Sequence, residues 1–342
     1  MTQDYIQEKH EKLAACLAQK GWLLADGATG TNLFRVGLET GYPPELWNFE
    51  APEKISALHN DFIDAGADII LTNSFGGNAL RLKLHEAEDR VAELNIAAAR
   101  LARAAADAAP RDVLVAGSIG PTGELFAPLG ALDMAQAEAV FAEQAEALAE
   151  GGVDLLQIET MSSLEEVEAA ANAGRATGLP VFATMTFDTA GRSMMGITPE
   201  DYAGYARKLG LNGFGANCGI GPAELLHSVT GFGEGGEQMI IAKGNCGIPQ
   251  YLDGKIHYHG TPELMASYAV LARDAGALVI GGCCGTTPEH IKAMAEALNS
   301  TPPGGRPDTD RLETELGIAW KDVPASPVGS NSRPRRRRRS AA

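Results

Sequence analysis

Short apolar segments alternate along the chain with longer amphipathic segments that are rich in Ala and Glu. The short segments are apolar at successive positions, which is typical of strands in a sheet that helices cover on both faces. They predict eight strands, near residues 22–27, 67–74, 113–120, 153–160, 181–188, 213–219, 239–245 and 278–285. The amphipathic segments predict helices near residues 53–65, 88–109, 134–150, 163–177, 199–209, 221–230, 262–275 and 288–298.

Three of these helices begin with the same tripeptide, Thr-Pro-Glu, at Thr198, Thr261 and Thr287. A threonine hydroxyl can cap free backbone N–H groups, proline fits the first helical turn, and an acid is favourable near the positive end of a helix. Eight strand–helix units in strict alternation over roughly 277 residues match the size of a TIM (β/α)8 barrel. We therefore predict an α/β protein with this barrel and prefer it to an open, doubly wound sheet.

Both ends of the chain lie outside the eight units. Residues 1–20 contain an extra helix, predicted over residues 5–20, and the barrel is expected to occupy residues 21–299. Residues 300–342 are rich in Pro and Gly and end in an arginine run, with Arg333 and Arg335 to Arg339. This composition predicts an irregular tail whose arginines are either solvated or bound to an acidic surface.

The charge of the chain excludes several classes of function. Of its 342 residues, 28 are Lys or Arg and 44 are Asp or Glu, which gives a net charge of −16. A chain this acidic repels nucleic acid and anionic membranes, so we expect neither as a partner. The sequence has no apolar run of about 18 residues and no signal peptide at its start, so we expect a cytoplasmic protein. The sequence does not determine the oligomeric state, and it is compatible with a homo-oligomer.

Cysteines gather where the predicted strands end, at the barrel face that carries active sites in TIM barrels. Cys218, Cys246, Cys283 and Cys284 fall there, and Cys16 lies on the N-terminal helix. Disulfide frameworks are rare in the cytosol, so metal binding is the better hypothesis. Thiolates of Cys218, Cys283 and Cys284 on Zn²⁺ would leave one tetrahedral position open, which is typical of a catalytic zinc.

Other interpretations of the cysteines remain. They could be small buried residues, or Cys283 and Cys284 could form a vicinal disulfide. Cys246, His257 and His259 could also be further metal ligands. We prefer a site without them, because a fourth protein ligand would leave no room for a substrate.

Four motifs in this chain resemble the homocysteine S-methyltransferase family. They are DGATGT at residues 26–31, GPTGE at 120–124, GANCG at 215–219 and GGCCGTT at 281–287. The resemblance spans about residues 20–298 and is greatest to bacterial betaine–homocysteine S-methyltransferases. The homocysteine-binding domain of cobalamin-dependent methionine synthase is a close second. The resemblance implies a TIM barrel, zinc held by the three cysteines, and homocysteine bound by Asp26, Gly27 and Glu159.

The implied reaction transfers a methyl group from glycine betaine to homocysteine and gives methionine and dimethylglycine. A free thiol with a pKa near ~8.5 is mostly protonated at neutral pH, and coordination to zinc supplies it as a thiolate. The leaving dimethylglycine is a neutral amine and needs no general acid. We therefore expect no catalytic residue beyond the zinc-bound substrate thiolate, and we expect Asp26 and Glu159 to bind the homocysteine ammonium.

A quaternary ammonium donor calls for aromatic side chains around it. The candidates are Tyr42, Trp47, Phe75 and Phe187, of which Trp47 and Phe75 are the expected donor contacts. Animal betaine enzymes have an aromatic residue directly after the glutamate, whereas this chain has Thr160. S-methylmethionine, a dimethylsulfonio compound or a separate corrinoid protein are therefore alternative donors, and the last would make this chain the homocysteine-activating subunit of a methionine synthase. A non-catalytic zinc- or thiol-binding barrel is a further alternative.

Overall fold

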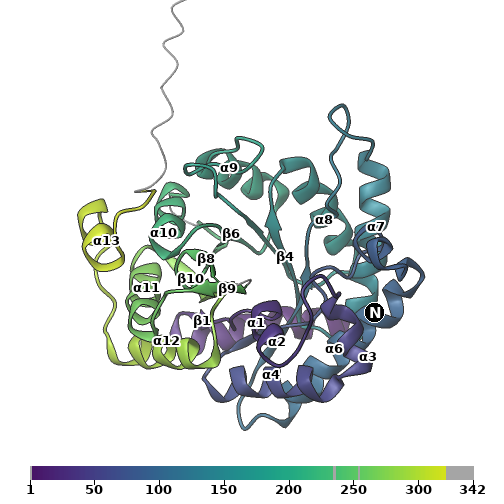
Figure 1. The fold of residues 1–342 in the computed structure, drawn as a ribbon, viewed down its shortest axis with the longest axis horizontal. Coiled ribbons are helices and arrows are strands. Elements are labelled where there is room, and N and C mark those ends of the chain that lie inside the picture. Colours follow the sequence, from purple (N-terminus) through teal and green to yellow (C-terminus); the bar gives the residue numbers. More distant parts are fainter. Residues whose placement is uncertain (1, 234–235, 253–254, 321–342) are drawn as a thin grey trace, which may run out of the picture.

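A ring of parallel strands forms the centre of the molecule (Figure 1). The computed structural model describes residues 2–233, 236–252 and 255–320. Within them the ring consists of β1 (Leu23–Leu24), β2 (Ile69–Leu71), β3 (Leu114–Ile119), β4 (Leu155–Met161), β5 (Val181–Met185), β6 (Gly213–Cys218), β7 (Met239–Gly244) and β10 (Ala277–Gly282). The strands pair in the order β1-β10-β7-β6-β5-β4-β3-β2, and a parallel bridge between Ala25 and Ile69 closes the ring. The predicted TIM barrel is confirmed.

Eight helices surround the ring at the predicted places. They are α4 (Pro52–Asp64), α6 (Val91–Ala108), α7 (Met134–Glu150), α8 (Leu164–Ala176), α9 (Pro199–Leu209), α10 (Pro222–Gly231), α11 (Pro262–Asp274) and α12 (Pro288–Ser300). The hydroxyls of Thr198 and Thr261 accept the N–H groups of Asp201 and Leu264, so both caps form as the sequence predicts. These caps fix the points where the chain leaves the loops that follow β5 and β7.

The N-terminal helix α1 (Gln3–Lys20) packs across the amino ends of the strands. Its Leu13 and Cys16 belong to a buried cluster with interior residues of the strands, such as Leu114 and Ile241. Lys9 Nζ lies 2.8 Å from a carboxylate oxygen of the fully buried Asp154, and the salt bridge is itself shielded from water. The predicted extra helix is confirmed, and it closes the amino end of the barrel. Any cavity in the barrel must therefore open at the carboxyl ends.

Several elements were not predicted. An antiparallel hairpin, β8 (Pro249–Leu252) and β9 (Lys255–Tyr258), lies between β7 and α11. Within the tail that we expected to be irregular, α13 (Thr309–Leu316) packs against α10 and α11. The arginine run lies outside the described residues. The loops after β1 and β2 contain short helices: α2 (Gly30–Arg35), η1 (Pro44–Leu46), α3 (Trp47–Glu50), α5 (Ala79–Leu82), η2 (Lys83–His85) and η3 (Glu88–Arg90).

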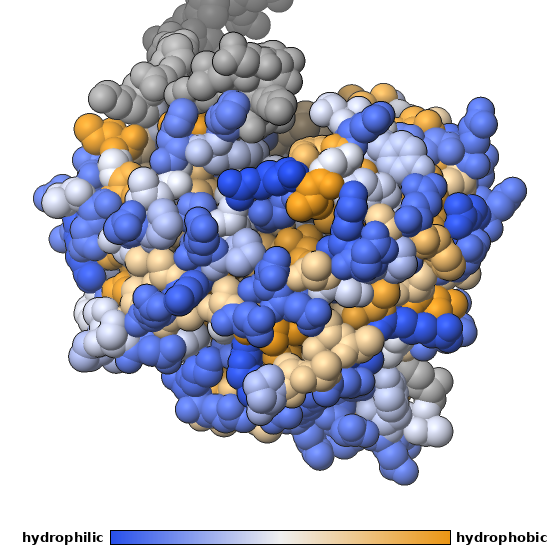
Figure 2. All heavy atoms as spheres, turned by 60° about the horizontal axis from the view of Figure 1, so that its bottom comes forward, coloured by the Kyte–Doolittle hydropathy of each residue, from blue (hydrophilic) through white to orange (hydrophobic). Residues whose placement is uncertain are grey.

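The face of the molecule drawn in Figure 2 is mainly hydrophilic. Figure 2 shows one face of the molecule, on which hydrophobic residues surface only in small patches between hydrophilic ones. None of the helices that the structure describes has the length and apolar character needed to span a bilayer. Apart from Ile318, the large hydrophobic side chains that are exposed lie in segments that follow the carboxyl ends of strands. They are Phe34, Val36, Tyr42, Phe49, Phe75, Leu84, Leu125, Leu129, Met194, Met195 and Ile248.

A buried histidine gives the fold a predictable response to acid. His59 of α4 is fully buried, its Nε2 has no hydrogen-bond partner, and burial lowers its pKa from 6.5 to about 4. Between these pH values the unfolded chain binds a proton that the folded chain does not. The stability contributed by neutral His59 is therefore complete above pH 6.5 and is lost as the pH falls towards 4.

We predict that His59→Leu removes this part of the pH dependence. Because one pKa unit corresponds to about 1.4 kcal/mol, the variant should gain up to about 3 kcal/mol relative to the wild type between pH 6.5 and 4. The free energy of unfolding in urea, measured on both metal-free proteins across this range, checks it. Parallel pH profiles for the two proteins would contradict the assignment.

Candidate active site

Three cysteines meet at the carboxyl ends of two strands. Cys218 is the last residue of β6, and Cys283 and Cys284 directly follow β10. Strand β7 lies between these strands, and its Gly244 is in register with both Cys218 and Gly282. The Sγ atoms of the three cysteines all lie within 4.8 Å of one another. The structure thus brings together the three residues that the sequence assigns to a metal.

Unusual backbone conformations allow the sulfur atoms to converge. Cys218 has a φ of 61°, in the left-handed region that non-glycine residues rarely adopt. After the cysteine pair, Gly285 has a φ of 80°, and a Cβ there would lie 2.3 Å from the ring of Tyr258. A Cβ at Gly282 would lie 2.3 Å from the side chain of Thr286. The glycines on both sides of the pair therefore permit a turn that larger residues would block.

Two asparagines connect the cysteine-bearing segments. The Asn245 side chain accepts the N–H of Cys284 at 3.0 Å and donates to the carbonyl of Gly219 at 2.6 Å. The Asn217 amide nitrogen lies 3.7 Å from the Sγ atom of Cys283 and can donate to it. Asn245 thus connects the segments after β6, β7 and β10, and Asn217 connects β6 to the segment after β10. The relative positions of the three sulfurs are therefore fixed by hydrogen bonds as well as by the barrel.

The electrostatics of the cluster favour a cation. For Cys218, the hydrogen bond with Cys283 lowers the pKa, but the hydrogen bond with Cys284 and burial outweigh it and raise the pKa to about 12. The pKa values of Cys283 and Cys284 are raised as well, so the three thiols are protonated without a metal ion. A divalent ion reverses this preference, because thiolates bind it directly. All five cysteines are free, so Cys283 and Cys284 do not form the alternative vicinal disulfide.

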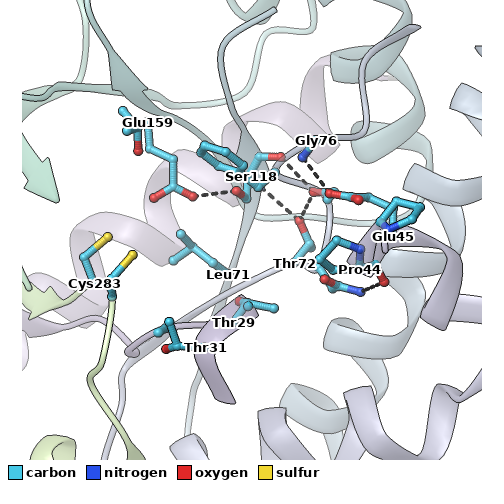
Figure 3. Close-up of a pocket in the computed structure, with 18 of the residues that line it drawn as sticks. Thr29, Thr31, Pro44, Glu45, Leu71, Thr72, Gly76, Ser118, Glu159 and Cys283 are labelled. Atoms are coloured by element: carbon cyan, nitrogen blue, oxygen red, sulfur yellow. Dashed lines mark hydrogen bonds between the residues drawn. The ribbon is translucent and has the colours of Figure 1, made fainter. Parts of the chain in front are cut away.

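A cavity of about 440 Å³ opens beside the cysteines. Its walls come from the segments after β1 and β2 and from the carboxyl ends of β3, β4, β6, β7 and β10. Figure 3 shows Glu159 and Cys283 projecting into the same space. The Glu159 carboxylate accepts a hydrogen bond of 2.5 Å from Ser118, which fixes its orientation. Gly27 also lines the cavity, at a point where a Cβ would lie 2.6 Å from the carbonyl of Thr286.

Asp26, which was expected to bind the homocysteine ammonium, does not reach the cavity. The residue is buried next to the cavity but does not line it. One carboxylate oxygen accepts the N–H of Leu71 at 2.7 Å, and the other lies 3.5 Å from Nζ of Lys243. Burial raises the pKa of Asp26 to about 6, although the lysine charge opposes this shift. Lys243, which the sequence analysis did not identify, stands between Asp26 and the cavity that it lines.

The four aromatic candidates divide into two pairs. Phe75 and Tyr42 line the cavity and are partly exposed. Trp47 and Phe187 do not line it: the Trp47 ring is covered by Nζ of Lys54 at 4.3 Å. Phe187 is buried in a cluster of aromatic rings with Tyr202 and Phe232. The expected contact of Trp47 with a donor is therefore not supported, because its indole packs behind the cavity wall.

Two further lining residues, besides Lys243, were not predicted from the sequence. Phe34, in α2, is exposed at the cavity. Glu45 is buried, and its carboxylate accepts the N–H of Gly76 at 2.6 Å; burial raises the pKa of Glu45. Both residues lie in the long loop after β1, where the sequence has no regular pattern that could place a side chain.

The other proposed metal ligands lie outside the cluster. Cys246 is buried and its thiol donates to the carbonyl of Gly260 at 3.2 Å. His257 and His259 are exposed. Among the residues that the structure describes, the one group with metal-binding geometry consists of Cys218, Cys283 and Cys284. The preferred interpretation, in which three cysteines leave a fourth position open, agrees with this arrangement.

The fold and the site define the protein as a TIM barrel with a three-cysteine centre at the carboxyl ends of its strands. Comparison with known proteins identifies the family. The model of the family described as homocysteine S-methyltransferase matches residues 23–298. The chain therefore belongs to the homocysteine S-methyltransferase family.

Among individual relatives, the chain is 31% identical over 297 residues to a methionine synthase of Mycobacterium tuberculosis and 30% identical over 340 residues to that of Mycobacterium leprae. The matches cover 81% and 90% of this chain but 24% and 28% of those proteins, so the chain spans about a quarter of their length. It also resembles the metallated form of the homocysteine methyltransferase MmuM from Escherichia coli, with 26% identity and a TM-score of 0.70. That match covers 83% of this chain and 99% of MmuM.

The cysteine cluster predicts how metal content responds to substitution. Cys283→Ser should lower the affinity for Zn²⁺ by more than about 100-fold, because loss of even an outer hydrogen-bond partner of a metal ligand costs about 10- to 100-fold. Cys246→Ser is the matched control and should retain the metal, since Cys246 lies outside the cluster. Competition with a zinc chelator measures both affinities. Equal metal affinity of the two variants would contradict the assigned ligand set.

Proposed function

We propose that this protein transfers a methyl group to homocysteine, with Zn²⁺ held by Cys218, Cys283 and Cys284. The observation that carries the proposal is the convergence of three sulfurs within 4.8 Å at the wall of a cavity of about 440 Å³. A tetrahedral ion with three protein thiolates has one position left for a substrate thiol. Membership in the homocysteine S-methyltransferase family supports the choice of that thiol.

The chemistry divides between the metal and the protein. Bound zinc lowers the pKa of a coordinated thiol and so makes it a thiolate nucleophile at neutral pH. Glu159, held by Ser118, presents a buried carboxylate to the homocysteine ammonium. The backbone at Gly27 allows the amino-acid end to approach the wall closely. The protein therefore orients the substrate, and no side chain has to move a proton during methyl transfer.

We propose glycine betaine as the methyl donor. Its leaving group is a neutral tertiary amine, so the transfer needs no general acid. Phe75, Tyr42 and Phe34 line the cavity, and aromatic faces attract a quaternary ammonium. Phe75 and Tyr42 were among the candidate donor contacts predicted from the sequence. We propose Phe34 as the third contact in place of Trp47, because Phe34 lines the cavity and Trp47 does not. All three residues lie in loops at the mouth of the barrel.

A corrinoid-bearing protein is the second candidate donor, and two observations favour it. The curated relatives described above are methionine synthases, of which this chain matches about a quarter. In addition, the exposed large hydrophobic residues gather in the loops around the mouth, among them Leu84, Leu129 and Met194. Exposed apolar residues of this kind can form a contact with a partner protein.

We also propose a cytoplasmic location, because the cytoplasm keeps thiols reduced. All five cysteines are free, and three of them must stay reduced to bind zinc. The substrates under this proposal are homocysteine and a methylated onium compound, both small molecules.

One assay separates the two donors. Zinc-loaded protein is incubated with L-homocysteine and glycine betaine in the absence of any corrinoid, and methionine is quantified. We expect methionine to form, and Cys283→Ser to reduce its formation to background. Methionine that forms only when methylcobalamin or a methylated corrinoid protein replaces betaine would overturn the betaine assignment but retain homocysteine methylation. No methionine with any of these donors or with S-methylmethionine would contradict the proposed function.

Glu159 should contribute to homocysteine binding and not to metal binding. Removing one partner of a buried ion pair costs about 2 kcal/mol or more, so Glu159→Ala should raise the KM for homocysteine at least about 30-fold. Glu159→Gln keeps the acceptor for Ser118 and isolates the loss of charge. Zinc content and steady-state kinetics check both variants; loss of zinc from Glu159→Ala would contradict this division of roles.

A further inference from the structure

Lys243 places a buried cation in the cavity wall. It lies on β7, in register with Asn217 of β6 and Gly281 of β10, so it sits between the two strands that carry the cysteines. Ile241, two residues earlier, packs in the interior of the barrel. Because side chains alternate along a strand, Lys243 points into the same interior, one layer nearer the mouth. Its side chain reaches the cavity there.

The ammonium of Lys243 is incompletely paired. The side chain is 3% exposed, and its nearest carboxylate oxygen, Oδ1 of Asp26, lies 3.5 Å away, at the limit of a hydrogen bond. That oxygen has no closer partner, because the main-chain N–H of Leu71 binds the other oxygen of Asp26. An ammonium has three protons to donate, and a buried charge without partners is costly. Lys243 therefore retains the capacity to bind an anion that enters the cavity.

The charges around the cavity match one class of ligand. Glu159 offers a carboxylate that can accept an ammonium group, and Lys243 offers an ammonium that can bind a carboxylate. Burial disfavours the charged lysine, but Asp26 and Glu159 outweigh this and keep the pKa of Lys243 raised. A cation and an anion beside a thiol-binding centre complement an α-amino acid that carries a thiol. The carboxylate of Glu159 alone would not distinguish such a ligand from a simple aminothiol, because both carry an ammonium group.

We propose that Lys243 binds the α-carboxylate of the substrate and thereby selects amino-acid thiols over thiols that lack this group. The proposal rests on the proposed function and refines it. In this arrangement Asp26 is a positioning residue: it holds the lysine at the cavity wall, and Glu159 is left to bind the substrate ammonium. The substrate is thus fixed at three points, which are its sulfur, its ammonium and its carboxylate.

The test compares two thiols that differ only in the carboxylate. Binding of L-homocysteine and of 3-aminopropane-1-thiol to zinc-loaded protein is measured by calorimetry for the wild type and for Lys243→Met, which has a similar length but no charge. We expect the wild type to bind homocysteine at least about 30-fold more tightly than the aminothiol, because loss of one partner of a buried charge pair costs about 2 kcal/mol or more. In Lys243→Met the preference should fall below about fivefold.

Controls separate this proposal from the proposed function. Lys243→Arg keeps the charge and should keep most of the preference, and all variants should retain one zinc per chain. If Lys243→Met weakens the binding of both thiols by the same factor, the lysine only neutralises the buried carboxylate of Asp26 and does not bind the substrate carboxylate. The proposal is then wrong. A wild type without preference for homocysteine would overturn it even if the variant does not fold. If neither thiol binds the wild type, the proposed function itself fails.

Discussion

The structure depends on bringing three sulfur atoms together from two strands that are not neighbours. Strands β6 and β10 both pair with β7, and neighbouring strands are about 4.8 Å apart, so two strands that flank a third are nearly 10 Å apart. The sulfurs nevertheless lie within 4.8 Å of one another. The chain achieves this at the strand ends, through the left-handed backbone at Cys218 and the glycine-flanked turn at Cys283 and Cys284. A strained conformation of this kind persists only where surrounding contacts fix it.

The rest of the barrel supplies those contacts. Asn217 and Asn245 connect the two segments that carry the three cysteines, and α1 fills the amino end with Leu13 and Cys16. The rigid ring then presents charged side chains from two strands to one cavity, with Glu159 on β4 and Lys243 on β7. Each charge is buried and is held by a neighbour, Ser118 for the glutamate and Asp26 for the lysine. The site is therefore already formed before a substrate enters.

The sequence predicted the elements of the fold better than the directions of its side chains. All eight strands and their helices could be located, because hydrophobic periodicity and Thr-Pro-Glu caps are local signals. The cysteine centre was also predictable, since its residues end strands. Trp47 and Phe187 were predicted near the donor but do not line the cavity. Closeness to a strand end does not determine the direction of a side chain, and the ring of Phe187 packs outward against Tyr202. Lys243 was overlooked, although a lysine inside the apolar run MIIAKGN is unusual and could have identified it.

The most direct test of this account counts the sulfur atoms around the bound metal. X-ray absorption at the zinc edge of the purified protein should show three sulfur ligands and one lighter ligand, and addition of L-homocysteine should change this to four sulfur ligands. A spectrum that homocysteine leaves unchanged, or fewer than three sulfur ligands in the protein alone, would contradict the claim that Cys218, Cys283 and Cys284 form an open centre for a substrate thiol.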